Sequence, residues 1–141
     1  MDRDELFQRI DTTWQELQEA LKEIPPERAA EPGAAGEWSV KDLLGHISFW
    51  ERNCAAELQL LEPDDVDEEL NVDEMNAREH DLIKDRSLAE LKDEFAQSHD
   101  ALMRVLRAAD DLDPDQVKGD TWEHYGEHAA DIRSWRQRLS I

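Results

Sequence analysis

Histidines are the residues of this sequence whose spacing most clearly suggests chemistry. His124 and His128 lie four residues apart, so on a helix their imidazoles stack on one face and can share one metal ion. Their row continues into Ile132 and Trp135, which predicts that this face is turned inward. Spacing alone leaves a second interpretation open, in which the pair only packs in a core or lies at the surface.

A third histidine lies on a different predicted helix. His46 follows Leu43 by three residues and precedes Trp50 by four, so it points to the same side as these apolar residues. It is therefore a candidate third ligand. His80 and His99 have no partner at helical spacing, and we interpret them as solvated or structural.

The segments that must position these histidines have the pattern of amphipathic helices. Apolar residues recur at intervals of three and four over about 7–24, 40–61 and 88–106, and a further helix is predicted over 120–139. Each narrow apolar stripe needs the others in order to be buried. The sequence therefore predicts an all-α four-helix bundle that forms one domain over residues 1–141.

Two of these helices carry clear start signals. Ser39 and Asp42 form a capping box, in which the hydroxyl accepts from the backbone of the first turn and the carboxylate reaches back. Ser87 and Glu90 repeat the same pattern. These pairs predict helix starts at residues 40 and 88.

The region between the second and third predicted helices begins with an acidic stretch. Its acidic run over 64–69 predicts a solvated loop. The spacing of Val72, Met75 and Asn76 allows a short helix after that loop.

Charge excludes several classes of partner. Sixteen Lys and Arg residues against 36 Asp and Glu residues give a net charge of −20, which opposes binding to nucleic acid or to an anionic membrane surface.

No apolar run approaches a transmembrane helix and the N-terminus lacks signal-peptide features, so we expect a cytoplasmic protein. The single cysteine, Cys54, agrees with a reducing compartment. Both a monomer and a homodimer remain open.

Two motifs resemble the DinB/YfiT-like superfamily. The run over 36–47 is similar to its signature of a tryptophan and serine followed by an acidic residue and a histidine, here with Trp38 and His46. The run over 121–132, with Tyr125 between the two histidines, is similar to the C-terminal histidine pair of that superfamily.

Within the superfamily, the sequence looks closest to the ClbS/DfsB-like branch. The features that carry this resemblance are the Trp50 and Glu51 pair, the segment over 71–76 and the ending over 129–135. The resemblance to the superfamily covers about residues 7–139.

The resemblance implies a bundle in the order up-down-down-up, with a long crossover that contains a short helix and that the region over 62–86 would supply. It also implies a divalent-metal site formed by His46, His124 and His128. Members with assigned activities include transferases that use low-molecular-weight thiols and a thiol-dependent maleylpyruvate isomerase. The ClbS-like branch includes a resistance protein that hydrolyses a reactive cyclopropane in a genotoxin, and members of this branch need not use a metal.

Three neutral imidazoles would leave the full charge of the ion in place with open coordination positions, the pattern of a catalytic site. Such an ion can lower the pKa of bound water to about 7 or deprotonate a thiol. We expect zinc or nickel ahead of iron or manganese. Asp42 and Asp131 are candidates to orient the rings as hydrogen-bond acceptors, and their alternative roles are a helix cap and a surface charge.

A set of aromatic and polar residues is predicted to line a substrate pocket. Its members are Trp38, Trp50, Asn76, Trp122 and Tyr125. Core packing is the alternative role for the tryptophans. Asn76 needs a hydrogen-bond partner, which is either a ligand or the crossover itself.

These features lead to a hypothesis with open alternatives. The chain is predicted to be a metal-dependent transferase that uses a low-molecular-weight thiol, or a hydrolase, acting on a small electrophile in detoxification. Apart from Glu123 or Glu127, no general base is identifiable, so turnover itself stays open. The alternatives are a metal-free ClbS-like hydrolase and a stress protein that binds a small molecule or metal without catalysis.

Overall fold

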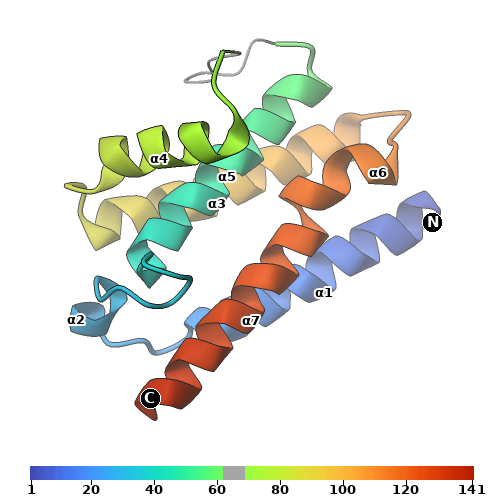
Figure 1. Ribbon diagram of the computed structural model, residues 1–141. Helices are drawn as coiled ribbons and strands as arrows, with labels where there is room; N and C mark the ends of the chain where they lie inside the picture. Colours follow the sequence, from blue (N-terminus) through green and yellow to red (C-terminus); the bar gives the residue numbers. More distant parts are fainter. Residues whose placement is uncertain (62–68) are drawn as a thin grey trace. The chain divides into compact units, whose positions relative to one another are not determined.

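The chain is built from helices joined by loops (Figure 1). The computed structural model describes residues 1–61 and 69–141. No β-strand occurs in these two ranges, where the only pairing of extended backbone is an isolated bridge between Ala35 and Trp38. The predicted all-α class is therefore confirmed. Apart from Glu69, the acidic run predicted as a solvated loop lies outside the described residues.

By its contacts, the described chain divides into two compact units, residues 1–43 with 112–141, and residues 44–111. In the first unit, α1 (Arg3–Leu21) and α7 (Trp122–Leu139) pack along each other. The buried residues that these two helices contribute include Leu6, Ile10, Leu17, Ala129, Ile132 and Trp135. The apolar stripes read from the sequence thus meet along the length of both helices.

Polar contacts fix both ends of α1. At its start, Asp2 accepts a hydrogen bond of 2.9 Å from the backbone N–H of Glu5. At its end, Nη1 of Arg136 donates to the carbonyl oxygens of Ala20 at 2.8 Å and Lys22 at 2.6 Å. Arg136 thereby occupies carbonyls that the end of a helix leaves without intrahelical partners.

The second unit consists of most of α3 (Val40–Leu58), with α4 (Val72–Ile83) and α5 (Leu88–Ala108). The apolar residues buried in this unit include Leu44, Ile47, Phe49, Ile83, Leu91, Phe95, Leu102 and Leu106. Gly45 permits the close approach of α4, because a β-carbon at this position would overlap the Cδ1 methyl of Ile83. The predicted short crossover helix is present as α4.

Capping boxes start the helices where the sequence predicts them. The Ser39 N–H donates to Asp42 at 2.9 Å, and the Asp42 N–H donates to the Ser39 hydroxyl at 3.1 Å. Ser87 and Glu90 form the corresponding pair at the start of α5, and Asn71 caps α4 in the same way.

Two helices end earlier than the apolar pattern predicts. Helix α1 ends at Leu21 rather than near residue 24, and α3 ends at Leu58 rather than near residue 61. Glu23 and Leu60 adopt φ angles of 60° and 57°, and this left-handed backbone cannot continue a right-handed helix.

Short turns of helix occupy the remaining connections. They are α2 (Pro26–Ala29), α6 (Pro114–Val117) and the 3₁₀ helix η1 (Lys118–Asp120). Proline at the first position of α2 and α6 suits a helix start, because the missing N–H would have no intrahelical acceptor there. None of the described helices combines the length and the apolar character that crossing a bilayer requires.

Candidate metal centre

Helix α7 presents two imidazoles to its buried side. His124 and His128 are 8% and 7% exposed, and their ring centroids are 4.6 Å apart with planes inclined at 67°. The four-residue spacing therefore places the rings next to each other, as helical geometry requires. Because both rings are buried, few water molecules would compete with them for a bound metal ion.

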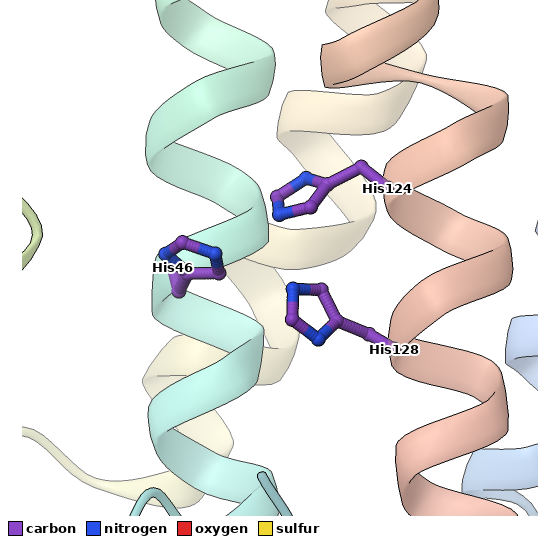
Figure 2. Close-up of side chains that lie close together, drawn as sticks. All are labelled: His46, His124 and His128. Carbon is purple, nitrogen blue, oxygen red and sulfur yellow. The ribbon is translucent and has the colours of Figure 1, made fainter. Parts of the chain in front are cut away.

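A third imidazole comes from His46 on α3, which is half-buried. One nitrogen from each of His46, His124 and His128 lies within 4.8 Å of the other two (Figure 2). Nitrogen ligands at zinc bond lengths of about 2.0–2.1 Å are roughly 3.3 Å apart in a tetrahedral site. His46, His124 and His128 are therefore a group that could hold a metal ion.

Asp131 orients one of these rings. Its Oδ2 lies 3.1 Å from Nδ1 of His128, and the Asp131 side chain is 38% exposed. A carboxylate only accepts hydrogen bonds, so Nδ1 carries the proton in this contact, and the lone pair of the neutral ring is at Nε2. This arrangement is typical of histidines that bind metals.

Asp42 has a different setting. Its carboxylate accepts from the backbone N–H of Ser39 in the capping box and is half-buried there. Its observed hydrogen bond is therefore a structural one at the start of α3.

The residues predicted to line a pocket are distributed over both units. In the first unit, Trp38 is half-buried beside the bridge to Ala35, and Tyr125 is fully buried with its ring edge against Trp14 at 5.1 Å. The guanidinium carbon Cζ of Arg9 lies over the ring of Trp122, 4.8 Å from the ring centroid. The buried indole nitrogen of Trp122 has no acceptor among the described residues.

In the second unit, Trp50 and Asn76 bond to each other. The indole N–H of Trp50 donates to Oδ1 of Asn76 at 2.7 Å, and the Trp50 ring contacts Phe49 edge-on at 5.0 Å. Asn76 lies on α4, so this hydrogen bond ties the crossover helix to α3. The contact satisfies the polar group of Asn76 through the protein itself.

One polar cluster was not foreseen from the sequence. Glu51 on α3 is fully buried, and its two carboxylate oxygens contact Ser98 at 2.8 Å and His99 at 3.0 Å on α5. The sequence carries a signal for Ser98 alone, which continues the three-and-four spacing between Phe95 and Leu102, and none that pairs it with Glu51. His99 was interpreted as solvated or structural, and its burial agrees with the structural interpretation.

Comparisons with known proteins identify the family. A family model of the DinB superfamily matches residues 9–137. A crystal structure of an uncharacterised protein from Escherichia coli UTI89 has the same fold, with a TM-score of 0.82 and 18% sequence identity over 98% of this chain and 94% of that chain. No curated protein matches the sequence. The matched family model covers most of the helical chain, and the chain therefore belongs to the DinB superfamily.

Proposed function

We propose that the protein binds a divalent metal ion through His46, His124 and His128 and acts on a small electrophile as a thiol transferase or a hydrolase. The observation that carries the proposal is the convergence of three imidazole nitrogens within 4.8 Å. Neutral imidazole is a good ligand for zinc, nickel and iron, and the donor set therefore fits a metal of this kind.

The chain's own residues supply the orientation of this centre. Asp131 keeps a proton at Nδ1 of His128, so that Nε2 faces the ligand side. The burial of His124 and His128 excludes most bulk water from the two rings. A divalent ion in such a setting would supply Lewis acidity toward a thiol or a small electrophile.

The proposal extends to the chemistry around the ion. Zinc or nickel is expected ahead of iron or manganese, and a low-molecular-weight thiol is the proposed second substrate. A role in detoxification and stress response follows from the resemblance to the ClbS/DfsB-like branch, whose motifs recur at Trp50, Glu51 and 71–76. The net charge of −20 supports a small-molecule substrate over a nucleic acid.

The test compares apo and metal-loaded protein in a defined reaction. The protein is stripped with a chelator, reloaded with zinc or nickel, and mixed with 1-chloro-2,4-dinitrobenzene and cysteine, where the thiolate displaces chloride. We expect metal-dependent acceleration that is lost in His124→Ala and retained in His80→Ala, which removes a half-buried histidine of α4.

The other outcomes separate the alternatives. Full activity of the apo protein toward an electrophile would contradict the metal role and favour a metal-free hydrolase. Tight metal binding without turnover of any electrophile tested would contradict the enzymatic part and favour a binding protein.

A further inference from the structure

The Glu51 cluster lies entirely within the second unit and is built around one carboxylate. Glu51 is 0% exposed, and burial of a charged or polar group is costly unless hydrogen bonds compensate for the lost water. Both of its oxygens are engaged: Oε1 accepts from the Ser98 hydroxyl at 2.8 Å, and Oε2 lies 3.0 Å from Nδ1 of His99. One carboxylate thus joins a hydroxyl and an imidazole.

The direction of these hydrogen bonds defines the role that each group can take. A carboxylate accepts, so Nδ1 of His99 donates to it and holds its plane. The Ser98 hydroxyl has a single proton and two acceptors in reach, Glu51 at 2.8 Å and the carbonyl oxygen of Phe95 at 3.2 Å. The shorter contact is with the carboxylate. An oxygen nucleophile within 2.6–3.2 Å of a base that a third group orients is the general pattern of an activated nucleophile.

Ser98 is also reachable from outside. It lines an open groove of about 620 Å³ whose other lining residues are Arg52, Glu94, Gln97, Asp100, Ala101 and Arg104. Two guanidinium groups therefore border the same space as the hydroxyl. Cations beside a reacting carbonyl stabilise the negative charge that develops on its oxygen.

Of the two arginines, Arg52 is partly engaged and Arg104 is open. Arg52 lies 3.6 Å from Glu79 and 4.0 Å from Glu94. Arg104 is exposed and makes no ion pair within 4.0 Å among the described residues. Arg104 is therefore available to the carbonyl oxygen of an ester in the groove, and the carboxylates of Glu94 and Asp100 in the same lining favour an ester whose acyl group is neutral.

We propose that Ser98 is a nucleophile for acyl transfer from small carboxylic esters, with Glu51 as its general base and His99 as a positioning residue. Oγ of Ser98 bonds to the ester carbonyl carbon while its proton passes to Oε1 of Glu51. The ester C–O bond then breaks, and the departing alkoxide takes that proton. Water hydrolyses the acyl-serine in a second step, with Glu51 again accepting the proton and returning it to Oγ.

The site uses none of the three histidines proposed to bind metal, so it is tested with a chelator present throughout. The intact chain is incubated with an alkyl fluorophosphonate, and the modified residue is located by peptide mass spectrometry. We expect one label per chain at Ser98 and none in Ser98→Ala. Ser48→Ala is the matched control, because Ser48 is also buried and donates to its own helix at Leu44. This variant should label like the wild type.

Hydrolysis of 4-nitrophenyl acetate tests the other two roles. Glu51→Gln should slow the acylation burst by ~100-fold or more, since a general base contributes about 10²–10⁴. His99→Asn keeps a donor near the position of Nδ1 and should retain most of the burst, whereas His99→Leu should lose it. A purely structural role would not separate these variants in their burst rate at equal helicity by circular dichroism. Absence of label in folded wild-type protein, or equal labelling of Ser98→Ala, would overturn the proposal.

Discussion

The hydrogen bond between Asp131 and His128 makes Asp131 the residue whose replacement should affect metal binding without removing a ligand. The carboxylate of Asp131 fixes the proton on Nδ1 of His128, at an Oδ2 to Nδ1 distance of 3.1 Å. Groups that orient a metal-binding histidine in this way raise the basicity of the ring and restrict its rotation. The contribution of Asp131 should therefore appear in affinity rather than in folding.

Replacing Asp131 by Asn tests this role. We expect Asp131→Asn to weaken zinc binding by about 10–100-fold, measured by competition with a chromophoric chelator. Glu127→Gln is the matched control, because Glu127 is exposed on α7 and its replacement removes the same charge. Equal loss of affinity in both variants would show that only net charge matters.

At the level of helices, the contact between Gly45 and Ile83 controls how closely α4 packs. Alanine at position 45 favours helix by about 1 kcal/mol over glycine but places a methyl group against Cδ1 of Ile83. Overpacking of a core costs about 1–3 kcal/mol, so Gly45→Ala should destabilise the wild type by about 1 kcal/mol net. Urea unfolding measures this difference.

The second variant of this pair removes the obstacle. Ile83→Val deletes the Cδ1 methyl itself, so Gly45→Ala should be neutral or stabilising in that background. The non-additivity of the two substitutions is the signature of direct contact. An equal loss of stability from Gly45→Ala in both backgrounds would contradict the direct contact between position 45 and Cδ1 of Ile83.

The capping box of α5 predicts a titration shift. The pKa of the Glu90 carboxyl lies below its ordinary value, first because the Ser87 side chain donates to it, then because of the Ser87 backbone N–H and of Arg86. Ser87→Ala should raise this pKa toward the ordinary value, as measured by carboxyl-detected NMR. An unchanged pKa in Ser87→Ala would contradict the assignment, and Ser134→Ala serves as the exposed-serine control.

The sign of the effect on stability follows from linkage. A lowered carboxyl pKa stabilises the fold above the pKa of the unfolded chain, and this contribution is lost as the pH falls through the folded value. The stability difference between the wild type and Ser87→Ala should therefore shrink as the pH falls below about 4.3, the ordinary value for Glu. A difference that grows with acidity would contradict this sign.

On the scale of the whole molecule, charge repulsion opposes compactness. A chain with a net charge of −20 should gain stability when salt screens it. Raising NaCl from about 0.01 M to about 1 M shortens the Debye length from about 30 Å to about 3 Å. We expect Tm at pH 7 to rise by about 5 °C or more, and the gain to be smaller near pH 4, where carboxyl groups are partly protonated. A flat or falling Tm at pH 7 would contradict this expectation.

The sequence predicts this fold well where local chemistry decides it. Ser39 and Ser87 mark helix starts because a capping box acts within four residues. The predicted ends of α1 and α3 were wrong. Glu23 and Leu60 adopt a left-handed backbone conformation, and neither position has the glycine that usually indicates such a helix end.

The same distinction holds for the sites. The pair His124 and His128 could be read from spacing within one helix, and His46 from a short motif. The cluster of Glu51 and His99 could not, because its partners are 48 residues apart and only tertiary packing joins them.

The metal content of the purified protein tests the proposal that three histidines hold one metal ion. The untagged protein is purified beside His124→Ala/His128→Ala, both are incubated with zinc or nickel and desalted, and metal per chain is counted by inductively coupled plasma mass spectrometry. We expect about one ion per chain in the wild type and none in the double variant. Equal metal content in the two proteins, or none in either, would contradict it.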